Sequence, residues 1–98
     1  MFTLEGLREL DVSGNSLTGS IPDLSKLRAL ETLNVAKNSL TGSIPESIGA
    51  LGALRDLDVS FTGLTGKLPT SLQQLSHLEE IKIQKTDLDF GDIGKGLT

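Results

Sequence analysis

Hydrophobic residues recur along the chain in one frame, L-x-x-L-x-x-L-x-L, which appears four times in succession. The last two apolar positions of the frame are Leu10 and Val12 in the first copy, and polar residues alternate with them. Equivalent pairs are Leu33/Val35, Leu57/Val59 and Ile81/Ile83. An apolar period of two residues is typical of a short strand with one buried face. The pattern therefore predicts four such strands, one in each copy of the frame.

The octapeptide N-S-L-T-G-S-I-P follows the predicted strand at residues 15–22 and again at 38–45, and a variant, T-G-L-T-G-K-L-P, stands at 62–69. Leu7 and Leu30 are 23 residues apart, and the steps from Leu30 to Leu54 and from Leu54 to Leu78 are each 24. Recurrence at a nearly fixed spacing indicates a repeat architecture. We therefore expect a single domain over residues 1–98, with repeats at about 4–26, 27–50, 51–74 and 75–98, the last degenerate.

This period leaves too little chain for an ordinary crossover helix between strands, so the chain is expected to coil and to place successive strands side by side in a parallel sheet. Asn15, Asn38, Thr62 and Thr86 share the position where each strand ends. An amide there can donate to and accept from the backbone of the turn, whereas a hydroxyl offers a single donor. We expect Asn38 to make more backbone hydrogen bonds than Thr62.

The pattern L-x-x-L-x-L-x-x-N-x-L resembles the leucine-rich repeat, and the ending L-T-G-S-I-P resembles its plant-specific subclass. The resemblance covers about residues 4–88 and implies an α/β-type solenoid, coiled right-handedly. It further implies a parallel sheet on a concave face, an extra short strand from the L-T-G segment, and short turns or 3₁₀ segments on the convex side. Such domains are typically non-enzymatic recognition surfaces, as in receptor ectodomains and polygalacturonase inhibitors. Thr62 and Thr86, in place of Asn, are similar to repeats of some protozoan surface antigens.

If the strands align, the side chains between the buried ones form columns on the concave face. The candidate partner-binding residues in these columns are Glu9, Asp11, Thr32, Asn34, Asp56, Asp58, Phe61, Glu80 and Lys82. Two further columns are expected to follow on the same face: Ser13, Ala36, Ser60 and Gln84, and then Gly14, Lys37, Phe61 and Lys85. The carboxylates favour a partner with a basic or hydrogen-bonding surface. A solvated sheet face is the competing interpretation, and Phe61 is expected either to contact a partner or to fold back on the sheet.

Arg8, Glu31, Arg55 and Glu79 occupy one position in four successive repeats, with alternating charge. Neighbours in this series are expected to pair across the coils, which would support the stacking register rather than recognition.

Composition narrows the class of function. The formal net charge is −4, there is no Trp or Tyr, and the basic residues do not cluster, so nucleic-acid binding is not expected. No apolar run approaches membrane-spanning length, so membrane insertion is not expected either. Without cysteine, thiolate metal sites are excluded. His77 is the sole histidine and has no evident nucleophile or carboxylate beside it, so no enzymatic activity is expected. The outward pairs Glu9/Asp11 and Asp56/Asp58 are about 10 Å apart across an intervening strand, so no metal is expected, and no cofactor is expected either.

Two interpretations of function remain. The first is a protein-interaction module that uses the concave face. The alternative is a structural or self-assembling repeat that associates through apolar residues of its end coils, namely Leu4, Leu7, Phe90, Ile93 and Leu97.

Overall fold

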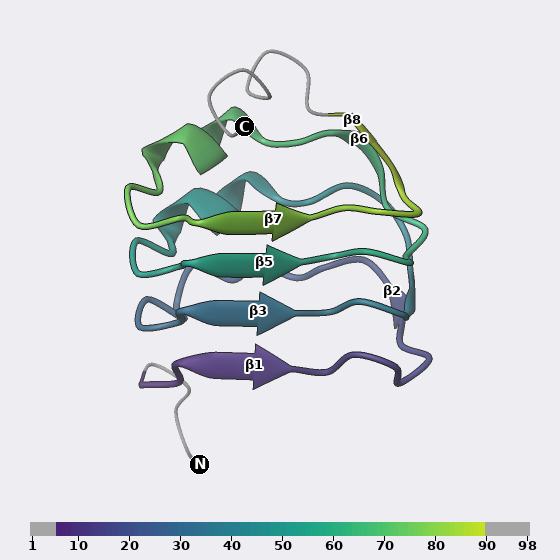
Figure 1. Cartoon of the computed structure of the whole chain (residues 1–98), viewed down its shortest axis with the longest axis horizontal. Coiled ribbons are helices and arrows are strands. Elements are labelled where there is room, and N and C mark those ends of the chain that lie inside the picture. The colour runs from purple at the N-terminus through teal and green to yellow at the C-terminus, as the bar shows by residue number, and fades with distance from the viewer. Residues whose placement is uncertain (1–5, 90–98) are drawn as a thin grey trace.

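A computed structural model of the protein describes residues 6–89, which form four stacked coils (Figure 1). Each coil contributes one strand to a four-stranded parallel sheet in the order β1-β3-β5-β7. These strands are β1 (Glu9–Asp11), β3 (Thr32–Asn34), β5 (Asp56–Asp58) and β7 (Glu80–Lys82). Leu10 pairs with Leu33, Leu33 with Leu57, and Leu57 with Ile81, so the register is the one that the leucine spacing predicts. The solenoid fold and the parallel sheet are confirmed.

A second set of short strands lies at the far end of each coil, at the L-T-G segments of the first three coils, as the family resemblance implied, and at Asp87–Asp89 of the fourth. β2 (Thr18–Gly19) pairs with β4 (Ser39–Leu40), and β6 (Thr65–Lys67) pairs with β8 (Asp87–Asp89). Two backbone hydrogen bonds connect the β4 and β6 segments, from Gly63 N to Leu40 O and from Thr65 N to Gly42 O, both 2.9 Å. The backbone ladder on this side therefore continues across all four coils.

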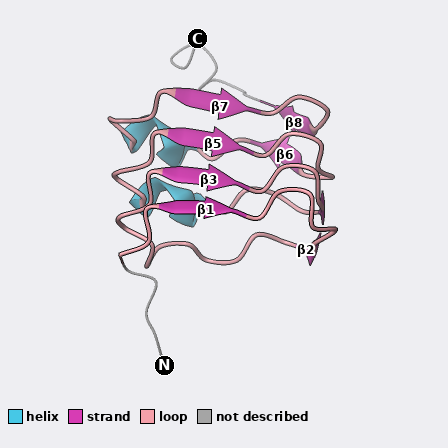
Figure 2. Ribbon diagram, turned by 60° about the horizontal axis from the view of Figure 1, so that its bottom comes forward, coloured by secondary structure: helices cyan, strands magenta, loops and turns pink. Residues whose placement is uncertain are grey.

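Two 3₁₀ helices lie behind the sheet, on the side expected to be convex: η1 (Glu46–Ala50) and η2 (Thr70–Gln74) (Figure 2). The corresponding segment of the first coil, residues 23–26, is one residue shorter and forms a turn without a helix. There, the Leu24 N–H donates to Ser47 Oγ of the next coil at 3.3 Å. The expected 3₁₀ segments are thus present in the second and third coils but absent from the first.

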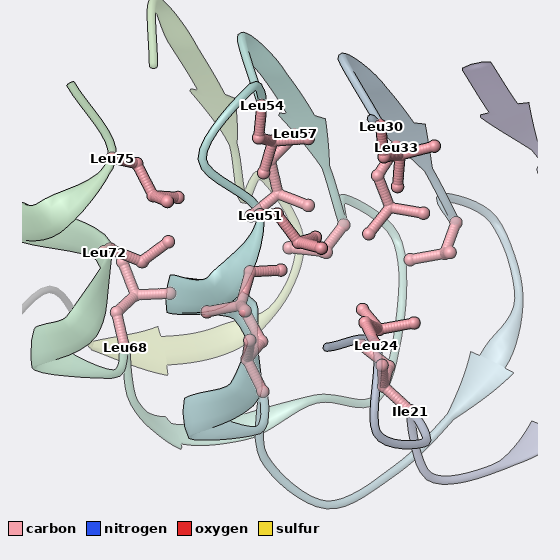
Figure 3. Close-up of a cluster of buried hydrophobic side chains, with 14 of the residues drawn as sticks. Ile21, Leu24, Leu30, Leu33, Leu51, Leu54, Leu57, Leu68, Leu72 and Leu75 are labelled. Atoms are coloured by element: carbon pink, nitrogen blue, oxygen red, sulfur yellow. The ribbon is translucent and has the colours of Figure 1, made fainter. Parts of the chain in front are cut away.

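The core runs along the inside of the stack (Figure 3). Leu30, Leu51 and Leu54, from the two middle coils, are fully buried. The equivalent Leu7 and Leu78, in the outer coils, are only partly buried. At this position, burial is therefore complete only where a described coil lies on each side.

Asn38 is buried and connects the first two coils. Its Oδ1 accepts from Asn15 N at 3.0 Å and from Leu17 N at 2.9 Å, and its Nδ2 donates to Val12 O at 3.0 Å. Nδ2 also donates to the carbonyls of Val35 and Ala36 in its own coil.

Thr62 occupies the same position one coil later, but its side chain forms hydrogen bonds only within its own coil. Its hydroxyl donates to Val59 O at 2.8 Å and accepts from Leu64 N at 3.5 Å. Thr86 repeats this arrangement with Ile83 O and Leu88 N. Asn38 therefore makes the larger number of backbone hydrogen bonds, as expected, and three of them cross between coils.

Replacement of Asn38 by alanine should lower the free energy of unfolding by about 1–3 kcal/mol, because buried N–H and C=O groups of two coils lose their partners. Thr62→Ala, the matched variant, should cost less, since only one coil is affected. Urea denaturation followed by circular dichroism measures both. An equal loss in the two variants would contradict the role given to the amide.

Gly49 sets how closely η1 and η2 pack. A Cβ added at Gly49 would overlap the Cβ of Ser71 and lie 2.8 Å from its Oγ and 3.2 Å from its carbonyl oxygen. Ser71 is held in place by its own hydrogen bond to Glu46 O at 2.9 Å. The contact between the two helices therefore requires a residue without a side chain at position 49.

Gly49→Ala should destabilise the protein by about 1–3 kcal/mol, as expected for overpacking. Gly52→Ala is the matched control, because no atom lies within 4 Å of the added Cβ. It should be neutral or stabilising by about 0.4–1 kcal/mol through the loss of unfolded-state entropy. Thermal unfolding of both variants distinguishes a steric effect from a general effect of removing glycine, and equal melting temperatures would argue against the contact.

Candidate functional site

The outer face of the four-stranded sheet brings together eight of the nine predicted partner-binding residues. We call these eight the sheet face. They stand in two columns, Glu9, Thr32, Asp56 and Glu80, then Asp11, Asn34, Asp58 and Lys82. Residues of the central strands β3 and β5 are half-buried, whereas those of β1 and β7 are exposed.

A shallow depression of about 210 Å³ lies over strands β3, β5 and β7. Its polar lining includes Asp56, Asp58, Glu80 and Lys82. Lys82 Nζ lies 3.8 Å from Glu80 Oε1, while within residues 6–89 neither Asp56 nor Asp58 forms an ion pair. The negative charge of the depression therefore lies on its two central aspartates.

Three residues of the second column also hold the backbone beyond the strand, which the sequence analysis missed. Asp58 Oδ1 accepts from Ser60 N at 3.0 Å and from Ser60 Oγ at 2.6 Å. Asp11 makes the same two bonds with Ser13, and Asn34 Oδ1 accepts from Ala36 N at 3.0 Å. The spacing Asp-x-Ser could have indicated this, because Asp and Ser form such local turns readily.

These hydrogen bonds lower the pKa of Asp11 from its ordinary value of 3.8, first through the Ser13 hydroxyl and then through its backbone N–H. A carboxyl whose pKa is lower in the folded state stabilises the fold above its unfolded pKa. That contribution is lost as the pH falls below 3.8 towards the folded pKa.

The two central residues of the third predicted column do not belong to the sheet face. Ala36 and Ser60 are buried, at 4% and 5% exposure. The chain turns inward at once after the strand, so the alternation of period two ends there. The expectation that these side chains point outward was wrong for Ala36 and Ser60, whereas Ser13 is half-buried and Gln84 is exposed.

The fourth column, Gly14, Lys37, Phe61 and Lys85, forms the rim of the sheet, and we call it the rim column. All four residues have a left-handed backbone conformation, with φ between 57° and 69°. The backbone holds them there, since Lys37 N donates to Ser60 O and Phe61 N donates to Gln84 O. Residues other than glycine adopt this conformation at a cost of about 1–2 kcal/mol. Phe61 is 51% exposed, so it is not folded back onto the sheet.

The alternating charges at the other end of the strands form two separate pairs. Arg8 Nη2 lies 2.7 Å from Glu31 Oε2, and Arg55 Nη2 lies 2.7 Å from Glu79 Oε2. Within the described part of the chain, no ion pair joins Glu31 to Arg55. Hydrogen bonding to Glu79, followed by its charge, raises the pKa of Arg55. The predicted pairing across coils is thus confirmed for two of the three adjacent pairs in the series.

Several other groups have no arrangement that supports chemistry. His77 is exposed in a turn. Among residues 6–89, no group of three or more His, Cys, Asp or Glu side chains is placed to hold a metal ion. No helix in the same range is long and apolar enough to cross a membrane.

An apolar depression of about 150 Å³ lies at the first coil, lined mainly by leucine, isoleucine and valine side chains. Leu17, in its wall, is 41% exposed. Of the end residues named from the sequence, Leu7 is described and is partly buried, whereas Leu4, Phe90, Ile93 and Leu97 lie outside the described residues.

Comparison with known proteins gives a consistent result. The family model for leucine rich repeats matches residues 5–64. No curated protein sequence matches the chain significantly. Many solved structures do, and three are representative.

One is the plant peptide hormone receptor RGFR1 in complex with RGF2, with 34% identity and a TM-score of 0.81 over 84% of this chain and 13% of that one. Another is the ectodomain of the receptor kinase GASSHO1/SCHENGEN3 from Arabidopsis thaliana in complex with CASPARIAN STRIP INTEGRITY FACTOR 2, with 38% identity and a TM-score of 0.81 over 84% and 10%. The third is the BIR3–SERK2 complex from the same plant, with 39% identity and a TM-score of 0.79 over 84% and 45%.

The chain spans less than half of each of these three proteins, at 13%, 10% and 45% of their lengths. The matched residues include the repeat frame and the L-T-G-S-I-P endings at Leu17–Pro22 and Leu40–Pro45. By its sequence pattern, its coiled parallel sheet and these matches, the chain belongs to the leucine-rich-repeat family, in its plant type.

Proposed function

We propose that this protein is a non-enzymatic interaction module whose sheet face binds a partner protein or peptide with a basic or hydrogen-bonding surface. The observation that carries the proposal is the depression over β3, β5 and β7, where Asp56 and Asp58 form no ion pair within residues 6–89, although Lys82 lies across from Asp58 on β7. A cationic side chain of a partner would complete the ion pairs that the protein itself leaves open.

The relatives support the same class of function. RGFR1 and GASSHO1/SCHENGEN3 were solved with bound partners, RGF2 and CASPARIAN STRIP INTEGRITY FACTOR 2, and BIR3 was solved with SERK2. An open parallel sheet on a solenoid gives a partner access to side chains from several coils at once. Each coil adds two side chains to the sheet face, so a partner lying across the strands contacts three or four coils.

The test removes charge without disturbing the turn. Asn34 accepts the Ala36 N–H in the way that Asp58 accepts the Ser60 N–H. Asp58→Asn should therefore preserve the backbone, and Asp56→Asn is added to it. A lysine-rich synthetic peptide, labelled for fluorescence anisotropy, serves as the probe. The double variant should bind it about tenfold more weakly, which corresponds to about 1.4 kcal/mol.

The matched control is Glu46→Gln combined with Asp87→Asn. Both residues are exposed, on η1 and β8, and the net charge changes by the same amount. The control should bind the peptide as the unaltered protein does. Equal weakening in both double variants would mean that only net charge matters and would refute a site on the sheet face.

A second candidate function is self-association through the first coil, and the exposed Leu17 beside the apolar depression favours it. Sedimentation velocity over a dilution series should then show concentration-dependent dimers, and Leu17→Lys should shift them to monomers. A protein that sediments as a monomer at every concentration would contradict this candidate.

A further inference from the structure

We infer that the rim column forms the second half of the recognition surface, and that the partner is an extended peptide segment with separated charges. Its basic side chains lie over the sheet face, and a carboxylate beside an apolar side chain lies over Lys37, Phe61 and Lys85. The inference rests on the proposed function and specifies the chemistry of its partner.

The first observation is the combination of side chains at the rim. Phe61 is 51% exposed, and it stands between two exposed lysines, Lys37 of the coil before and Lys85 of the coil after. Adjacent coils are about 4.8 Å apart, so the two lysines are separated by about 10 Å along the stack. A carboxylate placed between the ammonium groups is attracted to both, while the phenyl ring offers apolar area to a neighbouring aliphatic group.

The second observation is the backbone at these positions. Gly14 has φ 69° at the first coil, and Lys37, Phe61 and Lys85 have φ 57–58° at the next three. Glycine adopts this conformation without strain, and the first coil shows that the fold accepts it there. Three coils nevertheless carry long or aromatic side chains at a strained position. Strained residues of this kind gather at binding sites, where the side chain has a use outside the fold.

The third observation is the order of charges along the strand direction. Asp56 and Asp58 come first, Ser60 turns inward, and Phe61 follows at the rim. Five residues in extended form span at most about 16 Å, so one short peptide segment reaches from the aspartates to the rim. The surface is negative at one end of that path and positive at the other. A ligand with charges in the opposite order matches both ends.

Three synthetic peptides of equal length test the inference by fluorescence anisotropy. The segregated peptide has lysines in one half and leucine with glutamates in the other. The alternating peptide has the same composition with the charges interleaved, and the third peptide is basic throughout. The segregated peptide should bind about tenfold more tightly than the alternating one.

The rim variant combines Lys37→Gln, Lys85→Gln and Phe61→Asn. Asparagine tolerates the left-handed conformation, so the fold should be retained. The variant should bind the segregated and alternating peptides equally and should bind the basic peptide at least as well as before. Lys26→Gln with Lys67→Gln, which removes two exposed charges elsewhere, should keep the tenfold preference. If circular dichroism shows that the rim variant is unfolded, Phe61→Gly replaces it in the test, since Gly14 shows that glycine fits this backbone conformation.

Equal affinity for the segregated and alternating peptides in the unaltered protein would overturn the inference, as would a preference that survives the rim variant. If the basic peptide still binds in a manner that depends on Asp56 and Asp58, the proposed function stands and only the role of the rim fails. If none of the three peptides binds, both are refuted.

Discussion

The leucines of each coil of this protein are buried mainly by packing against the adjacent coils. Leu30 and Leu54, with a described coil on each side, are fully buried, whereas Leu7 and Leu78 of the outer described coils are only partly buried. Backbone hydrogen bonds also join each coil to the next. The carbonyls of Arg8, Glu31 and Arg55 each accept two N–H groups from the next coil. Stability in such a stack is close to a sum of contacts between nearest neighbours, so local defects act mainly at one interface.

The interfaces are not equivalent, and the difference follows from one side chain. Asn38 connects the first coil to the second through three hydrogen bonds, while Thr62 makes none to the second coil. Both interfaces share equivalent backbone bonds, since Ser39 N donates to Leu17 O as Gly63 N donates to Leu40 O. Between the second and third coils, the close packing of Gly49 against Ser71 is added. Adjacent coils are therefore joined by side-chain hydrogen bonds at one interface and by close packing at the next.

The repeat spacing was sufficient to predict the fold, the strand register and the columns of the sheet face, because a buried leucine at a fixed position leaves no freedom to slip. It was not sufficient beyond the strand ends. There the chain turns, and the burial of Ser60 and Ala36 depends on dihedral angles rather than on alternation. The double use of Asp58, in the depression and in its own turn, could have been predicted from the Asp-x-Ser spacing. The helix missing from the first coil follows from the single deletion after Pro22. Which groups bind a partner depends on the partner's own chemistry, about which the repeat pattern carries no information.

The paired arginines and glutamates have a consequence for how such an array can lengthen. Charge alternates from coil to coil at one position, so Arg8 meets Glu31 and Arg55 meets Glu79. Inserting a copy of one coil beside its original would place two like charges in adjacent coils, where they repel. Duplicating two adjacent coils together preserves the alternation throughout. The structural repeat is one coil, but the charges at this position favour lengthening of the array by two coils at a time.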